Sequence, residues 1–383
     1  NAIMQNSRKK NNHIAAISAA MLVGLLFAGS MPNAQAADVK IYSDVSSSDV
    51  YYGDIQWATK NGIAQGYNGK FNPNKKITIG QFCTMLSRSI SEGGQDEDDN
   101  GAKKGSMLYH LRRAVNRGWT DSGAELELRK DDAIQADSAW NYALTANGTQ
   151  VYSGLLSGTS SDSKDDGINT AKKLGLTVTN ANGLELITRA QAVSIIHAAQ
   201  KNTKSLPELP IVTEMKGVVE GLPQQQFNEF YASMKLIPES IRKDFISQGW
   251  KICFDVDRIN EYSKRNNIYG INGMTVYSEK VIYLAKASPL LHEMGHYYQE
   301  RIETSGMDVD VYKTFDIIRN SEKWSGTLYA TGRQTSGAEF FADAFQRYVR
   351  YGVVRTGFGN KDKKDILESQ QYFDNLASMG WIK

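Results

Sequence analysis

The sequence predicts a multidomain protein in which an all-α region of three repeats precedes an α+β domain. Three observations support this fold class. The chain has 383 residues, which is more than one ordinary domain usually holds. Before residue 205, three segments share a plan of short helix, glycine-rich turn and second helix, which is typical of a repeat bundle. After residue 205, helical patterns alternate with short runs of β-branched and aromatic residues.

Composition and charge exclude several classes of protein. The chain is 41% hydrophobic and 22% charged, which is typical of a globular protein. Its formal net charge is +2 and no basic stripe stands out, so we expect no nucleic-acid partner. Cys83 and Cys253 are the two cysteines and lie in different parts of the chain, so no disulfide framework is predicted.

The first 36 residues are typical of a secretory signal peptide. A basic patch at residues 7–10 precedes an apolar run over residues 14–29, and small residues follow, with a cut predicted after Ala36. The alternative is a transmembrane anchor, but the apolar run is short for a bilayer span. Met4 would be a natural start, so residues 1–3 are expected to be an artificial extension. We therefore expect a secreted protein without a membrane span after cleavage, and its few cysteines suit a Gram-positive cell surface.

The predicted repeats span about residues 38–91, 105–150 and 160–203. In the first repeat, the second helix is expected to start at Thr78, which serves as its N-cap. The third repeat follows the same plan, and the second is weaker. One face of the last helix is predicted to be apolar, and it carries Ala192, Ile195, Ile196 and Ala199.

These units resemble S-layer homology repeats, a family that forms three-fold helical bundles and binds a cell-wall polysaccharide without a covalent bond. Its Thr-Arg-Ala-Glu/Gln signature is complete at residues 188–191. Residues 78–81 lack the arginine, and the second repeat has Arg129 and Lys130 in a shifted frame. The resemblance implies that Arg189 contacts the polysaccharide and that the protein is held at the cell wall. The alternative for Arg189 is a solvated cation at a helix start.

Residues 204–212 are predicted to form an extended linker, because residues before proline avoid the helical region. Residues 213–383 have the size of one domain. The expected elements of this domain are helices over residues 224–235 and 238–247, a strand over 251–256, and a hairpin with strands over 274–277 and 281–285.

The motif HEMGH at residues 292–296 carries the chemistry of this domain. His292 and His296 are four residues apart on a predicted helix, so both imidazoles project from one face and can bind one Zn²⁺. Glu293 can lie beside the metal, take a proton from water and return it to the leaving amine. The alternative is a pair of surface histidines beside an ordinary glutamate.

That helix has clear boundaries in the sequence. Ser288 is a favoured N-cap, Pro289 suits the first helical position, and Gly306 follows the expected end. A properly bounded helix preceded by strands favours the zinc site over the alternative.

A third ligand must be a carboxylate or Cys253, because the remaining histidines, His13, His110 and His197, lie in the signal or the repeats. The best candidate is Glu339, on a predicted helix that carries Asp343 on the same face. Asp343 can accept a hydrogen bond from a ligand histidine and fix its tautomer. However, Ser336 and Glu339 also have the spacing of a capping box, so spacing alone leaves both roles open.

HEMGH followed by EFFADAF at residues 339–345 resembles the catalytic domains of anthrax lethal factor and the Pro-Pro endopeptidases. The similarity covers about residues 210–383 and implies a gluzincin-like zincin domain with Zn²⁺, Glu339 as third ligand, and cleavage of Pro-Pro bonds. The family also uses a tyrosine to stabilise the oxyanion. The nearest candidate is Tyr329, which lies farther from the glutamate than in the family, so an interface tyrosine is the alternative. In zincins, the strand before the metal helix offers its edge to the substrate, so we expect the peptide to lie along residues 281–285.

The sequence therefore predicts a secreted, cell-wall-associated zinc metalloendopeptidase that cleaves extended peptide segments. One alternative is a wall-binding surface protein with a vestigial peptidase domain. Another is a toxin-like protease that acts on a host protein.

Overall fold

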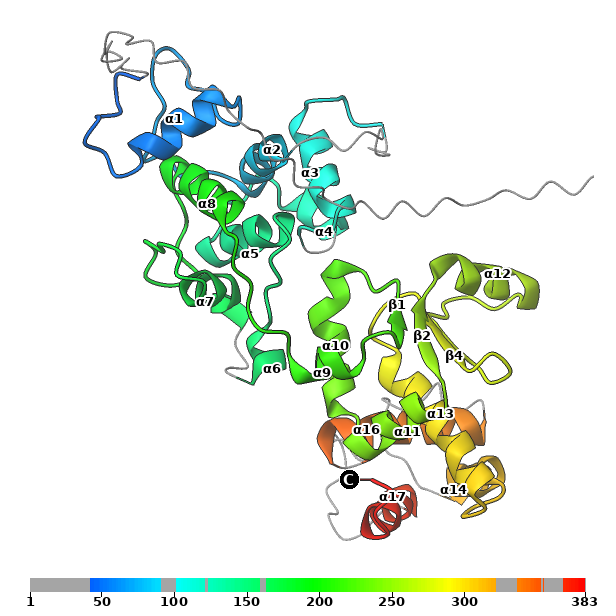
Figure 1. Cartoon of the computed structure of the whole chain (residues 1–383). Coiled ribbons are helices and arrows are strands. Elements are labelled where there is room, and N and C mark those ends of the chain that lie inside the picture. Colours follow the sequence, from blue (N-terminus) through cyan, green and yellow to red (C-terminus); the bar gives the residue numbers. More distant parts are fainter. Residues whose placement is uncertain are drawn as a thin grey trace, which may run out of the picture. The chain divides into compact units, whose positions relative to one another are not determined.

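The computed structural model describes residues 42–90, 101–120, 123–158, 163–321, 336–352, 354 and 368–382. Over these residues the chain is mostly helical, with one small mixed sheet (Figure 1). The predicted signal peptide, residues 1–36, lies outside the described residues. Buried apolar side chains form two clusters, one within residues 42–199 and one drawn mainly from residues 211–376.

The repeat region is built from short helices. In its described residues these are α1 (Tyr52–Lys60), α2 (Ile79–Ser89), α3 (Met107–Asn116), α4 (Gly123–Leu128), α5 (Ala136–Ala146), α6 (Gly154–Ser157), η1 (Ser163–Asp165), α7 (Asp166–Lys173) and α8 (Arg189–Lys201). The predicted apolar face of α8 is confirmed, because its four named side chains are buried.

Two of these helices begin with the capping box that the sequence indicates. Thr78 caps α2, where its hydroxyl accepts a hydrogen bond from the backbone N–H of Gln81 at 3.2 Å. The Gln81 side chain accepts one from the backbone N–H of Thr78 at 3.1 Å. Thr188 and Gln191 form the same pair at the start of α8. The threonine and glutamine of the repeat signature thus satisfy backbone donors that a helix start leaves unpaired.

A closed ring of backbone hydrogen bonds relates the three repeats. Ile134 N–H donates to the Ile77 carbonyl at 3.0 Å, and Ile187 N–H donates to the Ile134 carbonyl at 3.2 Å. Ile77 N–H closes the ring on the Ile187 carbonyl at 3.4 Å. All three isoleucine side chains are buried. Each isoleucine immediately precedes the N-cap of a long helix, so the ring gives the region the three-fold arrangement expected of its repeats.

The ring also corrects the alignment of the second repeat. Arg129 and Lys130 were expected, in a shifted frame, to be the counterpart of the signature arginine, but they lie in the turn before Ile134. The residue equivalent to Arg189 is Ala136, the first residue of α5. The expectation was wrong because the charged pair was aligned by residue type, whereas the buried isoleucine determines the register.

The C-terminal region mixes helices with short strands. Its described elements are α9 (Pro210–Glu214), β1 (Val219–Glu220), η2 (Gln224–Gln226), α10 (Phe227–Leu236), α11 (Glu239–Ser247), β2 (Lys251–Phe254), α12 (Val256–Asn266), β3 (Gly273–Val276), β4 (Val281–Leu284), α13 (Leu290–Ser305), α14 (Val311–Ser321), α16 (Gly337–Tyr351) and α17 (Glu368–Ser378).

Two helix starts differ from expectation. Helix α9 begins at Pro210, inside the segment predicted to be extended, because proline is well tolerated at the first helical position. Helix α13 begins at Leu290 with Pro289 as N-cap, one residue later than predicted. Ser288 therefore does not cap the helix, and no side-chain cap hydrogen bond is present at this start.

The sheet has the strand order β1-β2-β4-β3. Strands β1, β2 and β4 are parallel neighbours, and β3 pairs antiparallel with β4 through the predicted hairpin. Residues 281–285 were expected to offer a free edge to substrate, but β4 is paired on both sides. The predicted hairpin already places β3 along one edge of β4, and the expectation was wrong because β2 pairs with the other edge. Within the described chain, β1 and β3 are the edge strands of the sheet, and β3 packs against α13.

Candidate metal centre

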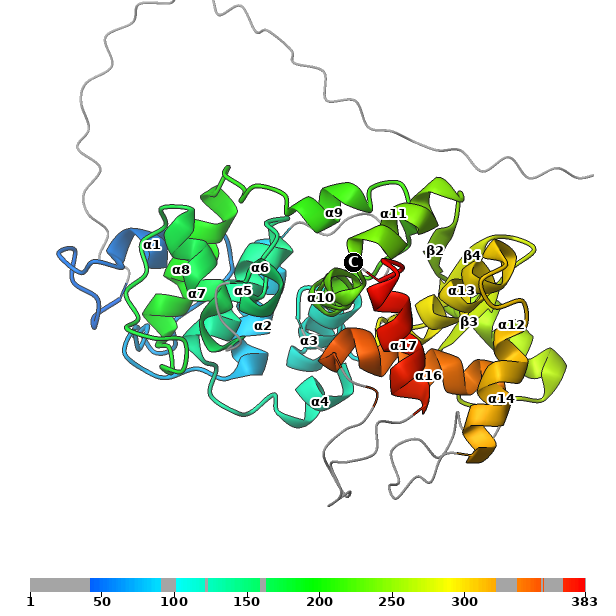
Figure 2. The ribbon, with the colours of Figure 1, turned by 90° about the horizontal axis from the view of Figure 1, so that it is seen from below.

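Helices α13 and α16 form the frame of the candidate site, and α16 also packs against α14 and α17 (Figure 2). The close approach depends on Gly295, in the middle of α13. A Cβ at this position would lie 2.7 Å from the Cα of Ala342 on α16. Because any larger residue would separate the helix backbones, Gly295 lets side chains of α16 reach those of α13.

Three side chains from these helices converge. His292 Nε2 lies 3.1 Å from His296 Nε2 and 3.1 Å from Glu339 Oε2. His296 Nε2 lies 3.4 Å from Glu339 Oε1. Tetrahedral zinc with bonds of about 2.0–2.2 Å separates neighbouring ligand atoms by about 3.3–3.6 Å. The three donors therefore have the chemistry and nearly the spacing of three corners of a zinc site, and they form the candidate metal-holding group found among the described residues.

Asp343 lies one turn beyond Glu339 on α16 and faces the other nitrogen of His292. His292 Nδ1 donates to Asp343 Oδ1 at 2.8 Å, which leaves Nε2 directed at the cluster. Burial lowers the pKa of His292, but the hydrogen bonds to Asp343 and Glu339 outweigh it and raise this pKa to about 10. The carboxylates thus favour a positive charge at this position, which a proton or a divalent cation can supply.

Glu339 does not form the capping box that its spacing allowed. Ser336 is the N-cap of α16, and its hydroxyl accepts from the backbone N–H of Glu339 at 3.2 Å. The Glu339 carboxylate instead faces His292 and His296, and hydrogen bonds from both histidines lower its pKa. The spacing of Ser336 and Glu339 left two roles open for Glu339, a capping-box partner or a candidate ligand beside the histidines. The position of its carboxylate matches only the second.

Glu293 lies on α13 beside the histidines and is 5% exposed. Its Oε2 accepts a hydrogen bond from the Thr275 hydroxyl of β3 at 2.8 Å. Burial raises the pKa of Glu293, although His296 and His292 oppose the shift. A buried carboxylate of this kind is suited to accepting and returning a proton.

An open cavity of about 740 Å³ adjoins these residues. Its lining includes the cluster, residues 270–275 leading into and along β3, and further residues such as Tyr262, Lys286 and Gln346. The cavity is large enough for several residues of an extended peptide.

Tyr329, the candidate oxyanion stabiliser, lies outside the described residues.

Three residues of the site were missed by sequence reasoning. Gly295 is a glycine in the middle of a helical pattern, which costs about 1 kcal/mol relative to alanine and therefore indicates close packing. Gly273 and Thr275 contact Glu293 from β3, two residues apart on one face of the strand. The glycine signal was available in the sequence, whereas the Thr275 contact had no local signature.

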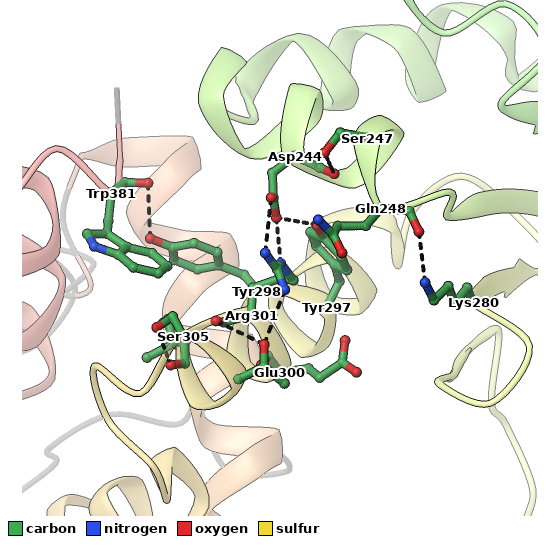
Figure 3. A network of polar contacts seen from close by, with 12 residues as sticks. Asp244, Ser247, Gln248, Lys280, Tyr297, Tyr298, Glu300, Arg301, Ser305 and Trp381 are labelled. Carbon is green, nitrogen blue, oxygen red and sulfur yellow. Dashed lines mark hydrogen bonds and ion pairs between the residues drawn. The ribbon is translucent and has the colours of Figure 1, made fainter.

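A polar network holds the C-terminal half of α13 (Figure 3). Asp244 of α11 accepts hydrogen bonds from Arg301 Nε at 2.7 Å and from the Tyr297 hydroxyl at 2.5 Å, both on α13. Tyr298 donates to the Trp381 carbonyl at 3.1 Å. These contacts connect α13 to α11 and to the C-terminal segment, so they stabilise the helix that presents the histidines.

This network predicts an acid-sensitive contribution to stability. Burial raises the pKa of Asp244, but hydrogen bonds from Arg301 and Tyr297 outweigh it and hold the pKa below its usual range. A lowered carboxyl pKa stabilises the fold above the unfolded-state pKa of about 4, and this stability is lost as the pH falls through the folded-state pKa. We expect Asp244→Asn to cost about 1 kcal/mol at pH 7, a figure reduced for solvent screening, and less near pH 3.

The measurement is thermal unfolding of both chains with a chelator present, so that metal loss does not contribute. Lys243→Gln is a matched control on the same helix, because Lys243 makes an exposed pair with Glu239. A difference between Asp244→Asn and wild type that stays constant from pH 7 to pH 3 would contradict the prediction.

Arg189 is partly buried at the start of α8. Its Nη2 donates to the Gln65 carbonyl at 2.7 Å, and its guanidinium carbon lies 4.8 Å from the centre of the Phe71 ring. These contacts join the third repeat to the first, so Arg189 is not the fully solvated cation considered as the alternative. Whether it also contacts a polysaccharide stays a prediction.

Residues 41–83 match the family described as the S-layer homology domain. The match covers the first repeat and supports association with the cell surface or cell wall. A search of curated proteins gave no match. No helix in the described part of the chain combines the length and apolar character that a membrane span needs.

Proposed function

We propose that the C-terminal domain is a zinc-dependent endopeptidase and that the S-layer homology region holds it at the cell wall. The observation that carries the proposal is the convergence of His292, His296 and Glu339 beside the buried carboxylate of Glu293. Two imidazoles and one carboxylate are a common protein ligand set for catalytic zinc, and they leave one position open.

The residues suit hydrolysis of a peptide bond. Bound Zn²⁺ would polarise the scissile carbonyl and lower the pKa of the attacking water. Glu293 accepts the proton of that water on its carboxylate and then donates it to the leaving amine. Asp343 keeps the proton of His292 on Nδ1, which leaves Nε2 free to bind the metal.

The substrate is proposed to be an extended peptide. Among the described residues, the edge of β3 away from β4 has no strand partner, and residues 273–275 line the cavity. This edge can offer backbone donors and acceptors to an added strand. A preference for bonds between prolines is part of the proposal, and it rests on the resemblance to the Pro-Pro endopeptidases.

The test is cleavage of a combinatorial peptide library by the purified full chain. We expect about one zinc per chain, cleavage that a chelator stops, and recovery when zinc is added. Equal cleavage of library members with and without proline would exclude the Pro-Pro preference but not the peptidase. A chain that neither binds zinc nor cleaves any library member would refute the proposed activity.

A wall-binding surface protein with an inactive C-terminal domain is the second candidate, favoured by the match over residues 41–83. Sedimentation with purified cell wall, together with a zinc measurement on the same sample, separates the two. A chain that sediments with the wall but holds no zinc supports this second candidate. A chain that does both supports a wall-held peptidase.

A further inference from the structure

We propose that Thr275 is a positioning residue that holds the carboxylate of Glu293 in its reactive orientation, with Gly273 providing the space for it. This inference rests on the proposed peptidase function, because it assigns a role in the same reaction. It concerns residues of β3, which lie outside the HEMGH motif and outside the helix that carries Glu339.

The first observation is the pair of contacts from Thr275 to Glu293. The Thr275 hydroxyl lies 2.8 Å from Glu293 Oε2 and 3.3 Å from the Glu293 backbone carbonyl. Both acceptors belong to Glu293, so this hydroxyl joins the side chain of the base to the strand. One carboxylate oxygen of Glu293 is thereby hydrogen-bonded to the strand.

The second observation is the space at Gly273. A Cβ there would lie 2.8 Å from Glu293 Oε1 and 2.9 Å from its Cγ, closer than real Cβ contacts allow. Gly273 is absent from the glycines with positive φ, so its backbone conformation does not itself require glycine. The absence of a side chain instead allows the strand to pack directly against the carboxylate.

Together the two residues restrict the end of the Glu293 side chain. The last torsion of a glutamate is broad, so an unheld carboxylate samples many orientations. Gly273 and Thr275 lie two residues apart and therefore share one face of β3. The strand backbone lies against Oε1 and the hydroxyl binds Oε2, which reduces this freedom. A base held in one orientation transfers protons faster than one that must first rotate into place.

The experiment compares wild type with Thr275→Val, Thr275→Ser and Gly273→Ala in the full zinc-loaded chain. The substrate is a peptide that the wild type cleaves. Valine keeps the shape of threonine without the hydroxyl, so we expect kcat to fall about 10-fold, while KM and zinc content stay near wild type. Serine keeps the hydroxyl and should restore most of kcat. Gly273→Ala should lower kcat at unchanged zinc content, because the new methyl group displaces the carboxylate.

The outcomes separate this inference from the function on which it rests. An active wild type with an equally active Thr275→Val would overturn the inference and leave the peptidase standing. Equal losses of kcat in the valine and serine variants, with a lower melting temperature, would indicate a structural role and also overturn it. A wild type without zinc or activity would refute the proposed function, and the inference would fall with it.

Discussion

Replacing Glu293 with glutamine is expected to abolish peptide cleavage while leaving the zinc content of the protein unchanged. The amide keeps the size of the side chain and can still accept the hydrogen bond from Thr275, but it cannot take a proton from water. Because general-base catalysis contributes about 10²–10⁴-fold to a rate, we expect kcat to fall by at least about 10³-fold. The measurement is turnover of a library-derived peptide, with zinc determined on the same sample.

Glu300→Gln is the matched control for this variant. Glu300 lies on the same helix, about two turns from Glu293, and is not among the proposed metal ligands. The same charge change at this position should leave turnover near wild type. Unchanged turnover in Glu293→Gln would refute the assigned role of Glu293, whatever the zinc content.

Replacing Glu339 with alanine is expected to remove zinc from the chain. The carboxylate is the one acidic member of the candidate cluster, and its loss leaves two neutral nitrogens to hold a divalent cation. Removing a group that hydrogen-bonds to a metal ligand lowers the affinity for the metal about 10–100-fold. Removing a ligand itself should therefore lower zinc affinity by more. Metal content after dialysis, and activity at increasing zinc concentration, measure the effect.

Ser336→Ala separates the ligand role of Glu339 from any role in starting the helix. Removing the hydroxyl deletes the cap hydrogen bond to the Glu339 backbone and should destabilise α16 by about 1 kcal/mol. It should not change the zinc content. If Ser336→Ala lost zinc as completely as Glu339→Ala, or if Glu339→Ala kept its zinc, the assignment of Glu339 as a ligand would be wrong.

Short-range patterns in the sequence predicted much of this architecture. The two histidines of HEMGH lie on one face of α13 because a helix turns once in 3.6 residues. Thr78 caps α2, as expected from its place before an apolar helical pattern. The hairpin of β3 and β4 likewise follows from two alternating runs around a short turn. Each of these features depends on residues within about one turn or one hairpin.

The errors arose where residues far apart in the chain meet. Residues 281–285 were expected to form the substrate edge, but strand order depends on pairing between β2 and β4, which are separated by α12. Arg129 was aligned with Arg189 by its charge, whereas the three-fold ring of Ile77, Ile134 and Ile187 places Ala136 there. Local propensity carries no information about either pairing.

The sequence by itself determined the repeat region, the helix with His292 and His296, and Glu293 as the candidate base beside them. Only the tertiary structure decided that the Glu339 carboxylate faces the histidines rather than its own helix start, and that Thr275 contacts Glu293. The physical reason is that α13 and α16 approach closely at Gly295, and that β3 packs against the same helix at Gly273. These contacts join residues 18–51 positions apart, and their geometry depends on packing rather than on any local pattern.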